Sequence, residues 1–259
     1  MSTTDAINQG DVNYSINDKG IATVVFNHPL SNSLPGRVLK KLADTITELG
    51  QKDEAKVIVL KSEGDRAFCA GASFDELISI KDLETGKKFF MGFANVINAC
   101  RKCPKLIIGR VQGKTVGGGV GLASAVDYCY ATKFSAVKLS ELAIGIGPFV
   151  VGPAVARKVG VSAMSQLATN ATEWQTADWA REKGLYAEIF DTVEEMDSEI
   201  EVLANKLASS NPEAMKLLKG IFWEGTENWD SLLQERAALS GELVLSDFTI
   251  NAINAFKKK

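Results

Sequence analysis

The chain has 259 residues and 46% of them are hydrophobic, which suffices for one large core, alone or with a small appendage. Its 29 basic and 32 acidic side chains give a net charge of −3 without a long run of one sign, and this balance argues against nucleic acid or an anionic membrane as a partner. The N-terminus has no signal pattern, no apolar run reaches the roughly 18 residues of a spanning helix, and the four cysteines lie among apolar neighbours, so we expect a cytoplasmic protein.

The first 150 residues alternate between short β-rich runs and helical stretches. We predict strands over residues 12–16, 21–26, 57–61, 106–111 and 128–132, and helices over 35–49 and 83–103. Beyond this point the apolar spacing predicts helices at 151–159, 162–169, 176–183, 193–209, 212–223 and 229–245. This order indicates an α/β fold that ends in a helical region.

Several motifs fail on inspection, and their failure excludes classes of chemistry. A GKT sequence lacks the first glycine of an NTPase phosphate-binding loop, because that position is Ile108, and a glycine run before Leu122 misses the last glycine of a dinucleotide fingerprint. Cys100 and Cys103 have the spacing of a zinc or redox pair but no second pair, so we interpret them as packed thiols. His28, the one histidine, precedes a proline in a predicted turn, so we predict neither a metal site nor a Ser-His-Asp triad.

Two glycine-rich turns and one carboxylate remain as candidates for chemistry. The turns are residues 70–72 and 117–121, and the carboxylate is Glu141. The second turn leads into a helical segment, where free N–H groups and the helix dipole favour negative charge, and the small side chains of the first turn let backbone approach a ligand oxygen. Together the turns would form an oxyanion hole that stabilises an enolate, with Glu141 as acid and base. Glycine turns also occur where a helix merely packs close to a sheet, so composition leaves both interpretations open.

Four blocks of sequence follow one another in an order that is typical of one family. The blocks are Asn27-His28-Pro29 with Asn32-Ser33-Leu34, then Arg66-Ala67-Phe68-Cys69-Ala70-Gly71-Ala72, then Gly113 with Gly117-Gly118-Gly119 and Asp127, then Ser140-Glu141-Leu142 with Gly145-Ile146-Gly147-Pro148. In this order and spacing they resemble the conserved segments of the crotonase family, the enoyl-CoA hydratase/isomerase superfamily. The resemblance extends along almost the whole chain.

The resemblance implies a fold and an assembly. The family fold is a spiral of β-β-α repeats, which we expect over residues 1–195. A C-terminal α-helical region that mediates trimers is expected over residues 196–259. We therefore expect a homotrimer or a dimer of trimers.

The resemblance also implies a ligand, an acyl-CoA thioester, in which coenzyme A enters as part of the substrate and no separate cofactor is needed. The N–H groups of Ala72 and Gly118 would bind the thioester oxygen, while Leu30, Ser31 and Ala70 would lie near the CoA. The remaining residues predicted to bind substrate are Gly71, Gly117, Gly121 and Phe149, with Phe256 and Lys259 reaching the CoA of a neighbouring subunit. Rough position suggests pocket walls at Phe74, Leu77, Phe89, Phe90 and Phe93, although residues of these types are more often ordinary core residues.

One departure from the family pattern bears on the reaction. Hydratases of the family usually carry two glutamates, and the corresponding positions here are Gly121 and Glu141. Hydration uses a carboxylate pair, whereas moving a double bond from the 3,4 to the 2,3 position needs one base. Residues 145–149 are also similar to those of single-glutamate enoyl-CoA isomerases. We therefore favour an isomerase, with an enoyl-CoA hydratase or a catalytically silent CoA-thioester binder as the alternatives.

Overall fold

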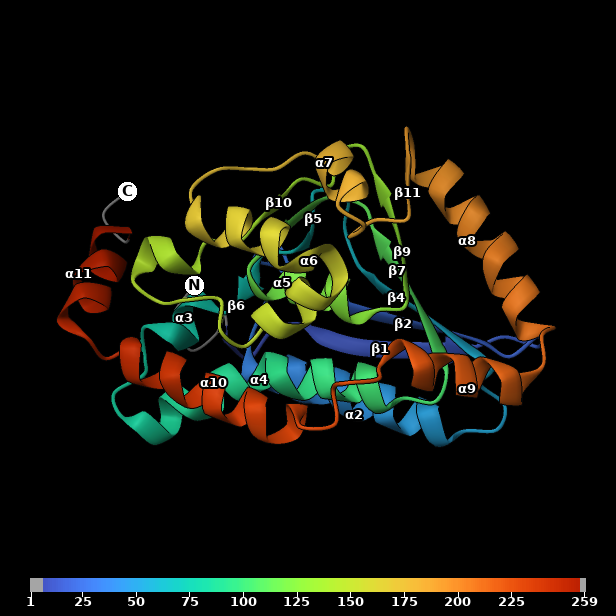
Figure 1. The fold of residues 1–259 in the computed structure, drawn as a ribbon, viewed down its shortest axis with the longest axis horizontal. Coiled ribbons are helices and arrows are strands. Elements are labelled where there is room, and N and C mark those ends of the chain that lie inside the picture. The colour runs from blue at the N-terminus through green and yellow to red at the C-terminus, as the bar shows by residue number, and fades with distance from the viewer. Residues whose placement is uncertain (1–6, 257–259) are drawn as a thin grey trace.

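A six-stranded sheet lies at the centre of the protein in the computed structural model, which describes residues 7–256 (Figure 1). In spatial order its strands are β1 (Asp11–Ile16), β2 (Ile21–Asn27), β4 (Val57–Ser62), β7 (Leu106–Val111), β9 (Tyr128–Thr132) and β11 (Glu188–Phe190). β1 runs antiparallel to β2, and the other neighbouring strands run parallel. β7 is buried along its whole length and is almost continuously apolar, as expected for a parallel strand covered on both faces.

Helices cover the two faces of this sheet. One layer consists of α2 (Gly36–Gln51), α4 (Leu83–Lys102) and α10 (Trp229–Leu243), while α8 (Val193–Ala208) contacts β4, β7 and β9 from the other face (Figure 1). The remaining helices are α3 (Phe74–Leu77), α5 (Gly118–Ala125), the 3₁₀ helix η1 (Glu141–Ile144), α6 (Gly152–Thr169), α7 (Ala177–Glu182), α9 (Pro212–Phe222) and α11 (Asp247–Phe256). None of the helices within residues 7–256 is long and apolar enough to cross a membrane.

Short strands form two smaller sheets beside the central one. β10 (Val137–Lys138), β8 (Lys114–Val116) and β5 (Ala67–Cys69) lie in this order in a parallel three-stranded sheet, and β3 (Ser33–Leu34) pairs with β6 (Gly71–Ala72). Since β5, β8 and β10 are parallel, their C-terminal ends lie at the same edge. The glycine-rich turns and the segment that carries Glu141 follow these ends.

The structure confirms the α/β fold class and the longer predicted elements. Each of the five predicted strands and of the predicted helices is present, and their ends differ from the predicted ones by at most two residues. The predicted break between residues 159 and 162 lies within α6, where Gly160 has a non-helical φ of 80°. The two- and three-residue strands were missed because they are too short to show an alternating pattern.

A buried ion pair attaches α9 to the central sheet. The carboxylate of Asp127 accepts hydrogen bonds from Lys219 Nζ at 2.8 Å, from the Ile107 N–H at 2.8 Å and from Trp223 Nε1 at 3.2 Å. Lys219 also donates to the carbonyl of Lys105 at 2.9 Å. The Lys219 and Asp127 side chains are only 3% and 5% exposed, so each charge depends on its protein partners in place of water.

Replacing Lys219 with Met should therefore destabilise the protein strongly. The variant leaves the Asp127 carboxylate buried without its cation, which costs about 3 to 5 kcal/mol in the free energy of unfolding. Urea denaturation measures this loss, and Lys216→Met on the same helix, where the side chain is 59% exposed, is the matched control with a cost of at most about 0.5 kcal/mol. Equal losses for the two variants would show that the ion pair does not hold α9.

Candidate active site

The two glycine-rich turns lie next to each other because β5 and β8 are adjacent parallel strands. Gly71 and Gly117 have φ values of +91° and +53°, in the left-handed region that favours glycine. A Cβ atom added to Gly71 would lie 3.2 Å from the carbonyl oxygen of Val116 and 3.7 Å from the backbone nitrogen of Gly118. The backbones of the two turns therefore approach within the reach of a single ligand atom.

Gly118 begins α5 and supplies a backbone donor at the helix N-terminus. Its N–H has no carbonyl one turn earlier in the helix, and the helix dipole adds positive potential at this end. The preceding N–H, of Gly117, donates to the carbonyl of Lys138 at 2.9 Å, which fixes the turn against β10. A Cβ at position 118 would overlap the ring of Phe93, so only glycine fits here.

Ala72 supplies a second backbone donor from the other turn. The Ser73 N–H donates to the carbonyl of Leu34 at 2.9 Å, in the parallel pairing of β3 with β6. Successive N–H groups of a strand point to opposite sides, so the N–H of Ala72 points away from β3, toward the side on which α5 packs. Backbone N–H groups on two neighbouring turns are of the kind that binds a carbonyl oxygen as it gains negative charge, which makes Ala72 and Gly118 the candidate donors.

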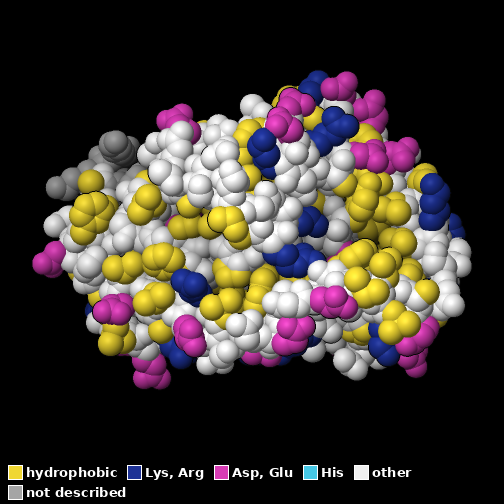
Figure 2. Space-filling view, in the orientation of Figure 1, with side chains coloured by type: hydrophobic (Ala, Val, Ile, Leu, Met, Phe, Trp, Pro, Cys, Tyr) yellow, Lys and Arg dark blue, Asp and Glu magenta, His cyan; other side chains and the backbone are white. Residues whose placement is uncertain are grey.

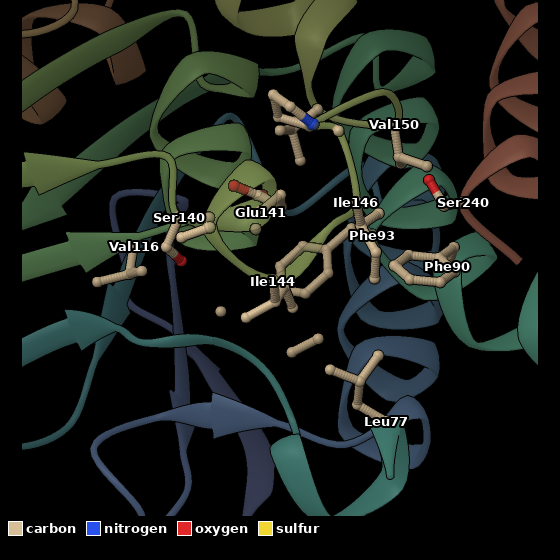
Figure 3. Close-up of a pocket in the computed structure, with 18 of the residues that line it drawn as sticks. Leu77, Phe90, Phe93, Val116, Ser140, Glu141, Ile144, Ile146, Val150 and Ser240 are labelled. Atoms are coloured by element: carbon tan, nitrogen blue, oxygen red, sulfur yellow. The ribbon is translucent and has the colours of Figure 1, made fainter. Parts of the chain in front are cut away.

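A cavity of about 480 Å³ opens beside these donors (Figure 3). Its wall is largely apolar, and Figure 3 shows Phe90, Phe93 and Leu77 on one side, with Val116 and Ser140 on the other and Glu141 between them. Most of the apolar wall comes from α3, α4 and the segment that follows η1. This lining fits a hydrophobic or mixed acyl group better than a sugar or a nucleotide base.

Glu141 is the one carboxylate among the described residues that line the cavity. It begins η1, and its Oε1 would lie 3.0 Å from a Cβ built on Gly117, so the carboxyl group is close to the turn that precedes α5. The residue as a whole is half-buried, but Oε2 is fully buried and has no hydrogen-bond partner within the described part of the chain. Burial raises the pKa of this carboxyl to about 7, while a hydrogen bond with its own backbone N–H opposes the shift.

Most of the residues predicted to form the site lie together in this cavity. The lining includes Ala70, Gly71, Ala72, Gly117, Gly118, Glu141 and Phe149, together with the predicted wall residues Phe74, Leu77, Phe89, Phe90 and Phe93. Phe256 is described only as the last residue of α11, without its side chain, and Lys259 lies outside the described residues.

Three predicted binding residues lie elsewhere. Leu30 and Ser31 are not part of the lining, although the Ser31 carbonyl accepts a hydrogen bond from the Ala70 N–H at 3.2 Å and so borders the cavity. Gly121 is buried inside α5, where a Cβ would lie 2.5 Å from Cγ1 of Val151. Gly121 is not part of the lining, whereas Val151 is, so a contact of Gly121 with substrate stays a prediction.

Several polar residues of the lining were missed, among them Lys138 and Ser240. Lys138 and Ser240 both line the cavity, but Lys138 belongs to a two-residue strand and Ser240 comes from α10, about 100 residues further along the chain. No local motif marks either residue in the sequence. Among residues 7–256, no group of three or more His, Cys, Asp or Glu side chains is placed to hold a metal ion.

The site lies within a segment that matches a known family, since the model of the enoyl-CoA hydratase/isomerase family matches residues 17–249. The chain belongs to this family. It is 29% identical over 242 residues to the short-chain-enoyl-CoA hydratase of Clostridium acetobutylicum, and the match covers 92% of each chain. It is 24% identical over 255 residues to the peroxisomal Delta(3,5)-Delta(2,4)-dienoyl-CoA isomerase of Arabidopsis thaliana, covering 92% of this chain and 90% of the relative. The crystal structure of enoyl-CoA hydratase from Bacillus halodurans matches with a TM-score of 0.86 at 17% identity, covering 94% of this chain and 99% of that one.

These matches confirm the crotonase resemblance and the crotonase-like fold. The protein is thus an enzyme of a family that acts on acyl-CoA thioesters. The named relatives include both a hydratase and an isomerase, so family membership does not determine which reaction this protein catalyses.

Replacing Glu141 with Gln should change how stability depends on pH. The carboxyl has a pKa of about 7 in the folded protein against an ordinary value of 4.5, so the folded state binds the extra proton and loses stability as the pH rises through this range. At about pH 8 the variant should exceed the wild type in the free energy of unfolding by up to about 3 kcal/mol, and this advantage should shrink toward zero below about pH 4.5. Urea denaturation at several pH values measures the difference, and a difference that does not vary with pH would contradict the buried environment of Glu141.

Proposed function

We propose that the protein is an enoyl-CoA isomerase, which moves a double bond of an acyl-CoA thioester from the 3,4 to the 2,3 position. The observation that carries the proposal is the single carboxylate on the cavity wall, Glu141, within the described residues. With a pKa of about 7, this group accepts and donates protons near neutral pH. One such group suffices for isomerisation, because the reaction removes one proton and returns one.

The geometry supports a mechanism through an enolate. The thioester carbonyl oxygen accepts hydrogen bonds from the N–H groups of Ala72 and Gly118. Glu141 removes a proton from the carbon next to the carbonyl, and the electron pair of that C–H bond forms an enolate whose charge the two donors and the α5 dipole stabilise. The electrons then return through the conjugated system, the double bond forms at the 2,3 position, and the γ-carbon takes the proton back from Glu141. No atom is gained or lost.

The packing around Gly121 supports a one-base reaction over hydration. A side chain at position 121 would meet Val151 at 2.5 Å and Ile97 at 3.7 Å, so α5 presents no carboxylate to the cavity and has no space for one. A hydratase that uses two carboxylates holds and deprotonates water with the pair. Hydration remains the second candidate because the relative from Clostridium acetobutylicum is named a hydratase, and a silent thioester binder is the third.

Replacing Glu141 with Gln should abolish isomerisation. We expect wild-type enzyme to convert trans-3-hexenoyl-CoA into the conjugated 2-enoyl isomer at unchanged mass, and the variant to lose about 10² to 10⁴ in kcat/KM, since the amide cannot remove a proton. The wild-type kcat/KM should rise as the pH increases through about 7, where Glu141 ionises. Ultraviolet absorbance and mass spectrometry measure the product, and Glu84→Gln, which alters an exposed carboxylate of α4, is the matched control.

Two other outcomes would assign a different function. If the wild type adds water to crotonyl-CoA efficiently, other groups activate water and the protein is a hydratase. If the protein binds acyl-CoA thioesters but turns over neither substrate, and the binding ignores Glu141→Gln, the protein is a binder without catalysis.

We also propose that the protein assembles as a homotrimer or as a dimer of trimers through its C-terminal helices. The support is the exposed apolar surface of these helices, which Figure 2 shows gathered over α9. The exposed residues are Leu217, Leu218, Ile221, Phe222, Leu239, Leu243, Phe248 and Ile250. Surfaces of this kind commonly mark protein interfaces.

Placing charges on α9 should therefore dissociate the assembly. Leu217 and Ile221 lie one helical turn apart and are 61% and 59% exposed, so the Leu217→Asp/Ile221→Asp double variant leaves the core of the subunit intact. Sedimentation equilibrium should give the wild type the mass of a trimer or of a dimer of trimers of the 27.9 kDa chain, and should give the variant a lower mass. A wild-type protein that sediments as a monomer would contradict the proposal.

A further inference from the structure

A lysine without an anionic partner lines the cavity. Lys138 is half-buried, and its Nζ lies 4.6 Å from the ring centroid of Trp174, a distance at which a cation is attracted to the indole face. Within the described part of the chain, the Lys138 ammonium forms no salt bridge and donates no hydrogen bond, whereas exposed lysines such as Lys40 and Lys41 pair with aspartates. A residue of the cavity lining thus carries a positive charge that no anionic group of the described chain neutralises.

The backbone of Lys138 places this charge close to the reacting atoms. Its carbonyl accepts the hydrogen bond from the Gly117 N–H, and Gly117 directly precedes the oxyanion donor Gly118. Lys138 also pairs in register with Val116 of β8. On its other side β8 pairs with β5, which leads into the loop at Ala70. The backbone of Lys138 therefore lies at the opposite edge of the three-stranded sheet from Ala70, and its side chain is long enough to reach the proposed thioester position.

This position decides which anion Lys138 can reach. The phosphates of coenzyme A are separated from the thioester by the whole pantetheine arm, and Ala70, where we expect the CoA to pass, lies two strands away from Lys138. An anion that reaches Lys138 would therefore lie beside the thioester and away from the CoA, and such an anion belongs to the acyl group. The side of the cavity formed by Phe90, Phe93 and Leu77 is apolar and offers a carboxylate no cation. Burying a carboxylate there without a cation would be costly.

We propose that the substrate is a short enoyl-CoA derived from a dicarboxylic acid. One end of its acyl group forms the thioester, the other end is a free carboxylate, and Lys138 Nζ binds this carboxylate. This inference rests on the proposed acyl-CoA function and names the substrate class for the same site. Trp174 holds the ammonium at the cavity edge without neutralising it, so binding replaces water at Lys138 with a charge-assisted hydrogen bond.

Binding of unreactive thioesters tests this inference separately from catalysis. Glutaryl-CoA and pentanoyl-CoA have acyl chains of equal carbon number, only the first has a terminal carboxylate, and neither has a double bond to move. Isothermal titration calorimetry should give wild-type protein a Kd for glutaryl-CoA about tenfold lower than for pentanoyl-CoA. Lys138→Met keeps the apolar stem beside Trp174, and should remove this preference by weakening glutaryl-CoA alone.

Two controls make the result specific. Lys114 lies over the same indole at 5.2 Å but does not line the cavity, so Lys114→Met should retain the preference for glutaryl-CoA. If Lys114→Met also removes this preference, the effect comes from the overall positive potential near Trp174, and the proposed contact with Lys138 is wrong. Free CoA should bind wild type and Lys138→Met equally. If Lys138→Met weakens free CoA and both thioesters to the same extent, the lysine binds a CoA phosphate and the inference is wrong.

The remaining outcomes separate this inference from the proposed function. A wild-type protein that binds both thioesters with equal affinity contradicts the dicarboxylic substrate and leaves the isomerase proposal standing. Failure of the wild type to bind any of the three CoA ligands contradicts the proposed function, and the inference about Lys138 fails with it. Glu141→Gln should bind glutaryl-CoA as the wild type does, since Lys138 acts on affinity without a proton transfer.

Discussion

The close approach of two stretches of backbone is the constraint on which the rest of this site depends. The two turns meet because β5 and β8 are neighbours, and a Cβ on Gly71 would crowd the Val116 carbonyl oxygen at 3.2 Å. Phe93 of α4 presses against Gly118, so the same ring closes the core and lines the cavity. A side chain at position 118 would therefore disturb the core packing and the proposed oxyanion donors together, so the proposed function links stability to activity at this position.

Two buried carboxylates show how the surroundings determine what an acidic side chain does. Asp127 accepts three hydrogen bonds, one of them from the ammonium of Lys219, and this full set of partners suits a group that holds two elements together. Glu141 has an oxygen that is buried without any partner, so its charged form is unfavourable and its pKa is raised. The proposed role of Glu141 as base and acid depends on this cost to stability, because a carboxyl with an ordinary pKa would stay ionised at neutral pH and would return a proton poorly.

The sequence predicts the long elements and the chemically obvious part of the site. Apolar periodicity identifies the central strands, and motif order identifies the turns at Gly71 and Gly118 and the acid Glu141. It does not reveal the short strands β8 and β10, because two or three residues carry no period, and so it could not place Lys138 on the cavity wall. Contacts between distant segments are equally hidden: the packing of Val151 against Gly121 depends on α6 meeting α5 in space.

The roles proposed for Lys138 and Glu141 both require that the two side chains stay apart. The two residues are three apart in sequence and both line the cavity, yet no salt bridge joins them in the described structure, since the chain leaves β10 and enters η1 between them. An ion pair here would lower the pKa of Glu141 and would occupy the charge of Lys138. The raised pKa of Glu141 thus comes from burial that no ion pair offsets, and the Lys138 ammonium stays available for a ligand. Because the fold keeps the base uncharged for much of the time, a second carboxylate on the substrate meets little repulsion from the enzyme and has a cation to bind.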